Sequence, residues 1–527
     1  MASVEEGGRA HAWSRHHADR APAIVFIGFM GAGKTTAANA ARAAGLSVTE
    51  ADELLEIELG MPIIKFFGRR GGEEFRALEA AEVGKLLENA DGGVVDLGGG
   101  AVYSERIRRA LERHVVVWLQ VSAEEAWRRV QGSERPLAQD RTRFEELHAE
   151  REPIYAHLAD AILPAADEEL VKRVLPSLLA LGELPHGTRM AWGMSASGEY
   201  PAFVGPGLLE ADWWPLESRR FGVSDTVVAK LYGDAVQPLA GMVTVDPGER
   251  AKTLAEAEGV LRELAQAGMT RDDHLVALGG GVVGDLGGFC AATYQRGVEV
   301  VQVPTTLVAQ VDSAYGGKTG VDLPEAKNYV GAYHLPSAVI ADTSTLATLP
   351  PEELAAGFAE VVKTALIAGG DLWERVGGLQ KLDPENLADV AFDCARTKLE
   401  VVAADERDTG RRAVLNLGHT VGHAIEAATG YERYRHGEAI ALGLLAALRL
   451  SDAGELRDEV AALLASHGLP TKLDAGVDID AVIEAVERDK KRTAEGVRFV
   501  LLARPGDPRR GQAVNPGALR AAVEELR

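Results

Sequence analysis

The sequence predicts an α/β protein made of two units, the second of which ends in a mainly helical part. Short β-branched runs alternate with longer helical stretches from residue 23 to about residue 164, the pattern of a parallel sheet covered by helices. A second alternation begins near Tyr200, with strands expected at 226–231, 275–278 and 298–303. From about Pro351 apolar residues recur at helical spacing until about 498–502, so the last third of the chain is expected to be mostly helical.

The first unit is expected to span residues 21–166, with strands at 24–27, 94–97, 115–121 and 161–163. Residues 1–20 are polar and include His11, His16 and His17, and a disordered tail is favoured there over a metal site. Residues 167–197 are the expected linker, because an amphipathic stretch is followed there by turn-forming residues. The second unit then divides into 198–350 and 351–527.

Composition narrows the class of protein. At 527 residues the chain is too long for one core, and its net charge of −23 disfavours binding to nucleic acid. The two cysteines, Cys290 and Cys394, form no disulfide framework and no thiolate metal site, which suits a reducing compartment. The sequence has no run of 18 apolar residues. We therefore expect a cytoplasmic protein that acts on small molecules, without a membrane or a nucleic acid as partner.

A phosphate-binding loop follows the first expected strand. The string Gly28-Phe-Met-Gly-Ala-Gly33-Lys34-Thr35 lies between a strand and a helix, as a P-loop requires. Lys34 would reach the β and γ phosphates, and the Thr35 hydroxyl would bind Mg²⁺. The expected ATP and Mg²⁺ contacts are Gly31, Ala32, Gly33, Lys34, Thr35 and Thr36. The motif indicates a nucleoside triphosphate as the phosphoryl donor but does not identify the molecule that accepts the phosphoryl group.

The acceptor is suggested by five further motifs. They are Glu50-Ala-Asp52, Phe75-Arg76 with Glu79, Leu97-Gly98-Gly99-Gly100, Arg135-Pro136-Leu137, and Arg151 followed by Tyr155. In this order they resemble shikimate kinase, which implies five parallel strands and ATP-dependent phosphorylation of the shikimate 3-hydroxyl. The implied shikimate contacts are Asp52, Arg76, Gly98, Gly99, Gly100 and Arg151.

The resemblance also implies roles in the phosphoryl transfer. Arg135 would lie on a lid and contact ATP, and Lys34 and Arg135 would neutralise charge on the transferred group. Asp52 would orient or deprotonate the attacking hydroxyl, so Lys34, Asp52 and Arg135 are the expected catalytic residues. One position departs from the family: Glu50 stands where an aspartate linked to the Mg²⁺ shell is usual.

The second unit contains a longer series of motifs. They are Leu278-Gly-Gly-Gly-Val-Val-Gly-Asp285, Pro304-Thr305-Thr306-Leu307, Gln310-Val-Asp312-Ser, Gly316-Gly317-Lys318-Thr319-Gly320, Lys327-Asn328, Glu360-Val-Val-Lys363, Gly418-His419-Thr-Val-Gly-His423, His436-Gly-Glu438 and Asp489-Lys490-Lys491. The series resembles 3-dehydroquinate synthase, which implies an NAD-binding α/β half and an all-helical half that binds a metal. Two positions depart from the family, Ala326 for glycine and Asp322 for asparagine.

Residue roles in this unit follow from the resemblance. The implied NAD contacts are Asp225, Glu249, Lys252, Gly280, Gly281, Val282, Asp285, Thr305, Thr306, Asp312, Lys318, Lys327 and Thr348. The implied substrate contacts are Arg296, Asp312, Lys318, Asn328, Lys363, Lys398, Arg412, Asn416, His423, Lys490 and Lys491. Lys318, Lys363 and His423 are the expected catalytic residues of this half.

The histidines leave a choice of metal ligands. His419 and His423 are four residues apart, so spacing alone would pair them on one helix face. The resemblance instead implies that Zn²⁺, or Co²⁺, is bound by Glu360, His419 and His436, with His423 facing the substrate.

The implied reaction of the second unit is cyclisation of 3-deoxy-D-arabino-heptulosonate 7-phosphate to 3-dehydroquinate and phosphate. A ring hydroxyl is oxidised by NAD, phosphate is eliminated, the ketone is reduced again, and the opened ring closes by an aldol step. The resemblance also implies a homodimer formed through this unit.

Three alternatives remain at this stage. One is a polyol dehydrogenase of the glycerol dehydrogenase type, against which the Lys- and Arg-rich substrate lining argues. Another is a related sugar-phosphate cyclase, which differs only in the hydroxyls that it binds. The third is a first unit that binds nucleotide without catalysis, and Glu50 keeps that alternative open.

Overall fold

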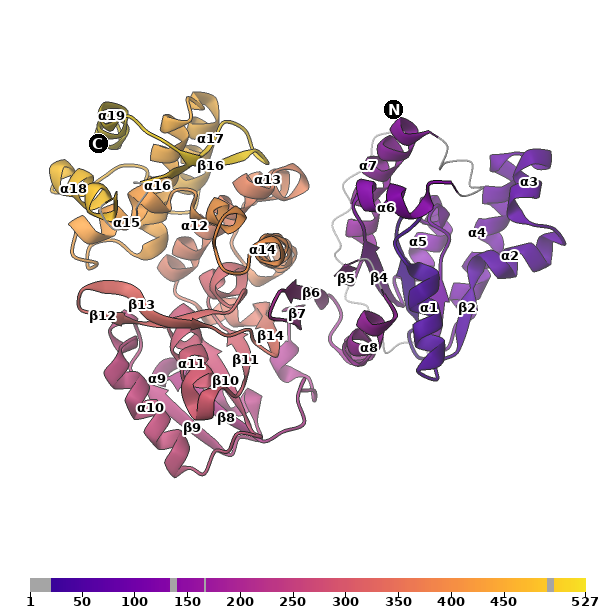
Figure 1. Ribbon diagram of the computed structural model, residues 1–527, viewed down its shortest axis with the longest axis horizontal. Helices are drawn as coiled ribbons and strands as arrows, with labels where there is room; N and C mark the ends of the chain where they lie inside the picture. Colours follow the sequence, from indigo (N-terminus) through magenta and orange to yellow (C-terminus); the bar gives the residue numbers. More distant parts are fainter. Residues whose placement is uncertain (1–19, 133–139, 165–166, 491–496) are drawn as a thin grey trace. The chain divides into compact units, whose positions relative to one another are not determined.

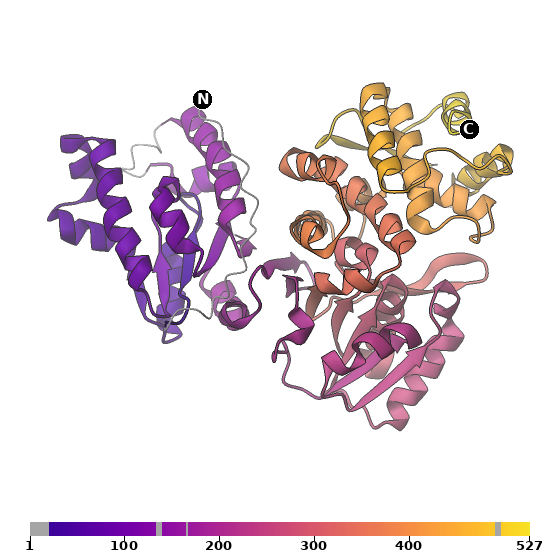
Figure 2. The ribbon, with the colours of Figure 1, turned by 180° about the vertical axis from the view of Figure 1, so that it is seen from behind.

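The computed structural model describes residues 20–132, 140–164, 167–490 and 497–527, with the side chains of 489 and 490 excepted. The described chain forms two compact units (Figures 1 and 2). The first runs up to Trp192 and includes Ala211–Pro215, and the second comprises Gly193–Glu210 and Leu216–Arg527. The expected tail with His11, His16 and His17 lies outside the described residues.

The first unit is a parallel sheet with helices packed on it. The strands pair in the order β2-β3-β1-β4-β5, and the start of β6 adds to β5. The strands are β1 (Ile24–Ile27), β2 (Val48–Glu50), β3 (Val94–Asp96), β4 (Val115–Gln120), β5 (Ala161–Pro164) and β6 (Arg189–Ser195). The helices are α1 (Lys34–Ala43), α2 (Ala51–Leu59), α3 (Ile63–Arg70), α4 (Gly72–Asn89), α5 (Glu105–Leu111), α6 (Ala123–Val130), α7 (Arg141–Leu158) and α8 (Glu168–Glu183).

The central strands are continuous apolar runs because helices cover both faces of a parallel sheet. All four residues of β1 are buried, as are the first five of β4. Residues 167–197, where a linker was expected, contain α8 and β6. The apolar face of α8 is buried, and this helix packs against α1.

The second unit has an α/β part and a mainly helical part. Its sheet is parallel, in the order β7-β14-β11-β10-β8-β9. The strands are β7 (Gly198–Gly205), β8 (Arg220–Asp225), β9 (Gly241–Val245), β10 (His274–Gly279), β11 (Glu299–Pro304) and β14 (Ala338–Asp342), with a hairpin of β12 (Lys318–Leu323) and β13 (Ala326–Tyr333). The helices of this part are α9 (Thr226–Tyr232), α10 (Leu254–Gln266) and α11 (Gly281–Thr293).

The mainly helical part appears in orange to yellow in Figure 1. Its helices are α12 (Pro351–Ala368), α13 (Gly370–Gly377), α14 (Pro384–Ala404), α15 (His419–Ala428), α16 (His436–Leu450), α17 (Gly454–Ser466), α18 (Ile479–Lys490) and α19 (Pro516–Glu524). The expectation of an all-helical half is wrong in one detail, because β15 (Phe499–Leu502) and β16 (Pro508–Gln512) form an antiparallel hairpin.

The strand expected at 226–231 is also wrong, because these residues form α9. The preceding strand, β8, ends at Asp225, whose carboxylate accepts the backbone N–H groups of Val227 and Val228 at 2.9 Å. This N-cap starts a helix in spite of the β-branched residues that follow. Val227 and Leu231 are more than half exposed, so their apolar character marks no buried strand.

Candidate active sites

The P-loop of the first unit lies between β1 and α1. Gly28, Gly31 and Gly33 have φ of 148°, 84° and 94°, which an L side chain rarely adopts. A Cβ on Gly28 would also stand 2.8 Å from the carbonyl oxygen of Leu119. Lys34 begins α1, and its ammonium group donates to the Gly28 carbonyl at 3.2 Å. The loop thus turns back on itself and leaves backbone N–H groups at a helix N-terminus, where phosphate binds.

A carboxylate that sequence reasoning missed lies beside this loop. Asp96 ends β3 and is buried, and its Oδ2 lies 3.2 Å from the Thr35 hydroxyl. Burial raises the pKa of Asp96 to about 6, while Lys34 opposes the shift. The available signal was an acidic residue at the end of a buried apolar run.

Three charged side chains converge on the strip Gly98–Gly100. A Cβ on Gly98 would lie 2.8 Å from the Asp52 carboxylate, and one on Gly99 would lie 3.5 Å from an Arg151 guanidinium nitrogen. A Cβ on Gly100 would overlap the Arg76 guanidinium. A side chain at Gly98 or Gly100 would therefore displace a charged group, whereas the nearest atom to a Cβ at Gly99 is the Gly28 carbonyl oxygen, at 3.1 Å.

Neighbouring groups hold the two arginines in place. Arg76 forms an ion pair with the buried Glu79. Burial raises the pKa of Glu79 more than the Arg76 charge lowers it, so the net shift is upward. Arg151 is buried, and its guanidinium lies 5.2 Å from the centre of the Tyr103 ring. Tyr155, one turn after Arg151, donates its hydroxyl to the Gly99 carbonyl at 2.6 Å. These contacts position two guanidinium groups and one carboxylate around the glycine strip.

In the second unit, neighbouring strand ends form a cradle at the sheet edge. Gly279 of β10 is in register with Pro304 of β11, so the glycines before α11 lie beside the Thr305-Thr306 turn. A Cβ on Gly280 would lie 2.9 Å from the Thr306 methyl carbon. The Thr305 hydroxyl is buried and has no hydrogen-bond partner among the described residues. The carboxyl edge of a parallel sheet, at a helix N-terminus, is a common site for dinucleotides.

A buried lysine gathers several carboxylates near this edge. The Lys252 ammonium lies 3.0 Å from Asp285, 3.2 Å from Glu249 and 3.9 Å from Asp322. Burial lowers the pKa of Lys252, but the carboxylates outweigh it and the net shift is upward. Asp322 also accepts the backbone N–H of Asn328 at 2.6 Å. The unusual aspartate at position 322 therefore faces a buried cation.

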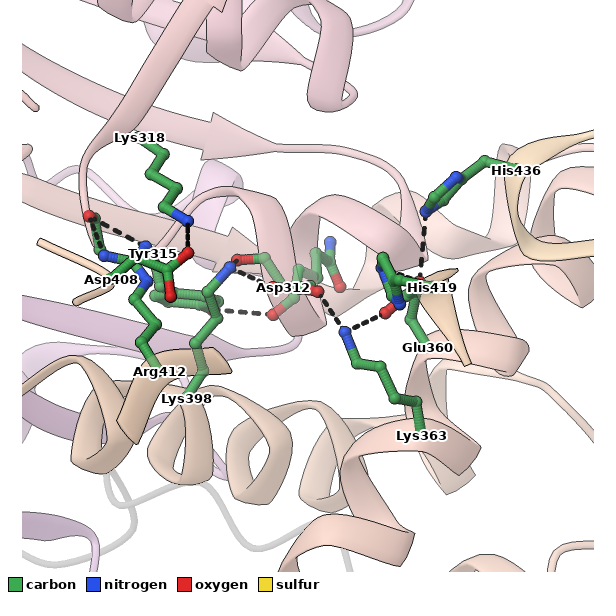
Figure 3. A network of polar contacts seen from close by, with 12 residues as sticks. Asp312, Tyr315, Lys318, Glu360, Lys363, Lys398, Asp408, Arg412, His419 and His436 are labelled. Atoms are coloured by element: carbon green, nitrogen blue, oxygen red, sulfur yellow. Dashed lines mark hydrogen bonds and ion pairs between the residues drawn. The ribbon is translucent and has the colours of Figure 1, made fainter. Parts of the chain in front are cut away.

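Asp312 joins lysines from two helices (Figure 3). Its Oδ2 lies 2.7 Å from the ammonium of Lys363 on α12, and its Oδ1 contacts Lys398 on α14. Burial would raise the Asp312 pKa, but the two lysines outweigh burial and lower it to about 2. Lys363 also pairs with Glu360, one turn earlier on α12, and both side chains are buried.

Glu360 in turn faces the histidines. Its Oε1 lies 3.7 Å from His419 Nε2 and 3.3 Å from His436 Nε2. The His419 Nδ1 lies 3.2 Å from the Leu417 carbonyl, which directs Nε2 towards Glu360. His423, one turn along α15 and exposed, lies close enough that ligand atoms of the three histidines fall within 4.8 Å of one another.

The charge states of these rings differ. Burial lowers the pKa of His419 to about 3, so this ring is neutral. Burial acts in the same direction on His436, but the nearby Glu360 and Glu426 carboxylates outweigh it and raise the pKa of His436 to about 10. Glu426 is buried, and its Oε2 lies 3.5 Å from His436 Nδ1. The two buried carboxylates thus favour positive charge between them, which a metal cation would also supply.

Comparison with known proteins identifies both units. A shikimate kinase family model matches residues 30–179, and models of the N-terminal and C-terminal parts of 3-dehydroquinate synthase match 242–356 and 357–492. The 3-dehydroquinate synthase of Symbiobacterium thermophilum is 45% identical over 351 residues, covering 62% of this chain and 98% of the relative. The chain belongs to the 3-dehydroquinate synthase family. It carries a shikimate kinase domain at its N-terminal end.

Further relatives match the synthase unit. The 3-dehydroquinate synthase of Halorhodospira halophila is 46% identical, covering 60% of this chain and 94% of the relative. A structure of 2-deoxy-scyllo-inosose synthase with carbaglucose-6-phosphate, NAD⁺ and Co²⁺ is 26% identical, with a TM-score of 0.58, covering 64% of this chain and all of that one. A 2-epi-5-epi-valiolone synthase from Streptomyces hygroscopicus with NAD⁺ and Zn²⁺ is 27% identical, with a TM-score of 0.58, covering 64% of this chain and 99% of that one.

The other expected synthase residues differ in their surroundings. The buried Arg412 donates to the carbonyls of Gly316 at 3.3 Å and Glu406 at 2.7 Å, and the half-exposed Lys318 pairs with Asp408. Lys327 lies 3.6 Å from Glu426. Asp225 caps α9. The Thr348 hydroxyl lies 2.6 Å from the Tyr232 hydroxyl. Arg296 and Asn416 are exposed. Arg135, Lys491 and the side chain of Lys490 lie outside the described residues.

Sequence reasoning missed Glu426 in the synthase unit. It follows His419 by seven residues on α15, which places it on the same helix face.

No helix in the described part of the chain is long and apolar enough to cross a membrane.

Proposed function

We infer that this chain is a bifunctional enzyme of the shikimate pathway. The kinase unit phosphorylates the 3-hydroxyl of shikimate with ATP, and the synthase unit converts 3-deoxy-D-arabino-heptulosonate 7-phosphate into 3-dehydroquinate and phosphate. This conclusion rests on two matches. The chain is 45% identical to a 3-dehydroquinate synthase over 98% of that relative's length, and its N-terminal part matches shikimate kinase. That identity favours this synthase over the related cyclases, which are 26–27% identical.

In the kinase unit we propose that Arg76 and Arg151 bind the shikimate carboxylate. Their guanidinium groups stand over neighbouring glycines of the strip, and guanidinium forks bind planar carboxylates in a bidentate way. The Asp52 carboxylate then accepts a hydrogen bond from a ring hydroxyl and orients it. Lys34, now bonded to the loop carbonyl of Gly28, reaches the β and γ phosphates of ATP.

In the synthase unit we propose Glu360, His419 and His436 as ligands of Zn²⁺ or Co²⁺. Their chemistry fits such an ion, since two imidazole nitrogens approach one carboxylate oxygen within 3.7 Å. Three protein ligands also leave a coordination position of the metal for the substrate. The exposed His423 lies close enough to this site to contact the substrate. Glu426 holds the other nitrogen of His436, as second-sphere carboxylates do.

NAD fits the cradle at the start of α11. A Cβ at Gly280 would lie 2.9 Å from the Thr306 side chain, and one at Gly281 would lie 3.0 Å from the Ser313 side chain. Glycine at both positions leaves the backbone free of side chains, so a ligand can approach it closely. The unpartnered Thr305 hydroxyl gives such a ligand a buried polar contact. When bound, the metal supplies Lewis acidity at the substrate hydroxyl and NAD a reversible hydride acceptor.

Buried cations prepare the synthase unit for an anionic substrate. Lys363 and Lys398 hold Asp312 ionised, and Arg412 is fixed by backbone carbonyls. We propose that these groups orient the phosphate and carboxylate of the substrate. Lys318, whose side chain is more exposed, would adjust its position to the bound substrate. The protein then contributes orientation and electrostatics, and the cofactors contribute the redox chemistry.

The two reactions are not consecutive, because dehydration and reduction separate dehydroquinate from shikimate. We propose that the fusion sets equal amounts of the two activities. We also propose that the chain is a homodimer formed through the synthase unit and acts in the cytoplasm, without nucleic-acid or membrane partners. The family resemblance supports the dimer, and the acidic surface and two buried free cysteines support the rest. Sedimentation at several protein concentrations tests the dimer.

Two assays on one preparation test the bifunctional assignment. Phosphate release from 3-deoxy-D-arabino-heptulosonate 7-phosphate is measured with and without a chelator, and ATP-dependent phosphorylation of shikimate is measured in parallel. Glu360→Ala should abolish only phosphate release, and Lys34→Ala should abolish only shikimate phosphorylation. Phosphate release without any shikimate phosphorylation would show that the first unit only binds nucleotide or uses another acceptor.

A further inference from the structure

Asp96 stands beside the hydroxyl that a P-loop offers to Mg²⁺. Its Oδ2 lies 3.2 Å from Thr35 Oγ1, and the Asp96 side chain is buried whereas Thr35 is exposed. Ligand oxygens about 2.05 Å from Mg²⁺ in an octahedron lie about 2.9 Å apart when adjacent. The two oxygens are therefore already near the separation that adjacent positions in one Mg²⁺ shell require.

Glu50, the carboxylate at the end of β2, pairs with an arginine of α1. Glu50 and Asp96 are register partners on the neighbouring strands β2 and β3, so both stand at the carboxyl edge of the sheet. The Glu50 Oε1 accepts from the Arg42 guanidinium at 3.0 Å, and Arg42 lies in the last turn of α1. That pairing engages the Glu50 carboxylate with Arg42, whereas the Asp96 carboxylate contacts the Thr35 hydroxyl directly.

We propose that Asp96, and not Glu50, supplies the carboxylate of the Mg²⁺ shell in the kinase unit. P-loop enzymes commonly hold Mg²⁺ with the loop hydroxyl and an aspartate at the end of a neighbouring strand. β3 is the direct neighbour of β1, which leads into the loop, whereas β2 lies one strand further out. The change at position 50 thus leaves the metal site intact because the carboxylate comes from the adjacent strand.

This inference rests on the proposed kinase function, so its test uses nucleotide binding and not turnover. Calorimetry on the full chain measures ADP affinity with and without Mg²⁺. Asp96→Asn should reduce the Mg²⁺-dependent gain in affinity at least tenfold and leave the metal-free affinity within twofold. Glu50→Gln, the matched control, should keep the gain within twofold, and Thr35→Val should lose it.

The opposite pattern overturns the proposal: a gain that survives in Asp96→Asn but disappears in Glu50→Gln would place the metal at position 50. Asp96→Ser provides a second variant, and thermal melting by circular dichroism shows that each variant is folded. Binding of Mn²⁺ to the ADP complex, followed by electron paramagnetic resonance, should weaken in both Asp96 variants. If the parent binds ADP with Mg²⁺ yet phosphorylates no shikimate, the proposed function fails while the assignment of Asp96 is still decided by these variants.

Discussion

Replacing Lys363 by methionine should strongly destabilise the metal-free synthase unit. Lys363 is buried, with its ammonium 2.7 Å from Asp312 Oδ2 and in contact with Glu360. At an effective dielectric of 20 the attraction to Asp312 alone is about 6 kcal/mol. Lys398 still neutralises Asp312 in the variant, whereas Glu360 must then share the positive charge of His436 with Glu426. Removing one member of such a buried group costs about 3–5 kcal/mol, the loss that we expect in the free energy of unfolding.

Urea unfolding of the metal-free protein, followed by circular dichroism, measures this loss. Lys230→Met, at an exposed position on α9, is the control and should change the unfolding free energy by less than about 0.5 kcal/mol. Added Zn²⁺ should stabilise Lys363→Met more than the parent, because the cation replaces the missing charge beside Glu360. A metal-free loss below about 1 kcal/mol would refute the reasoning, since the two carboxylates would then not depend on Lys363.

Two further predictions concern the glycine strip and a buried histidine. Gly100→Ala should raise the KM for shikimate at least tenfold and leave the KM for ATP unchanged, because its Cβ displaces the Arg76 guanidinium; a rise in both would contradict this. Burial lowers the pKa of His274 to about 4 from 6.5, so the unfolded chain takes up its proton first as the pH falls. Stability from the neutral ring is complete above pH 6.5 and lost towards pH 4. The parent should therefore lose about 3 kcal/mol relative to His274→Gln between pH 7 and pH 4 in urea unfolding, and parallel pH profiles would argue against it.

The sequence predicted the elements whose signals are local. The apolar run 24–27 matches β1, because a strand buried on both faces has no polar positions. The run 226–231 misled, because β-branched residues indicate a strand only when they are buried, and Asp225 caps a helix there. The strands β6, β7 and β14 were missed, and pairing with distant strands is what stabilises such segments.

The candidate sites divide in the same way. The P-loop string and the histidine motif could be recognised because their residues are close in sequence and their spacing is tied to one turn or one helix. Asp96 and Glu426 were missed because their local signals, an acidic residue after an apolar run and a spacing of seven from His419, do not by themselves name a partner. Their roles depend on Thr35 and His436, which reach them only through the pairing of β1 with β3 and the packing of α15 on α16.

By itself, the sequence determined that the chain joins a kinase and a synthase, since motif order and residue type are properties of the chain alone. The tertiary structure decided which charges meet. Asp312 is joined to lysines 51 and 86 positions away, and the glycine strip receives side chains from three different helices. Electrostatic energy depends on distances in space and on burial, and both arise only when sheet pairing and helix packing bring remote segments together.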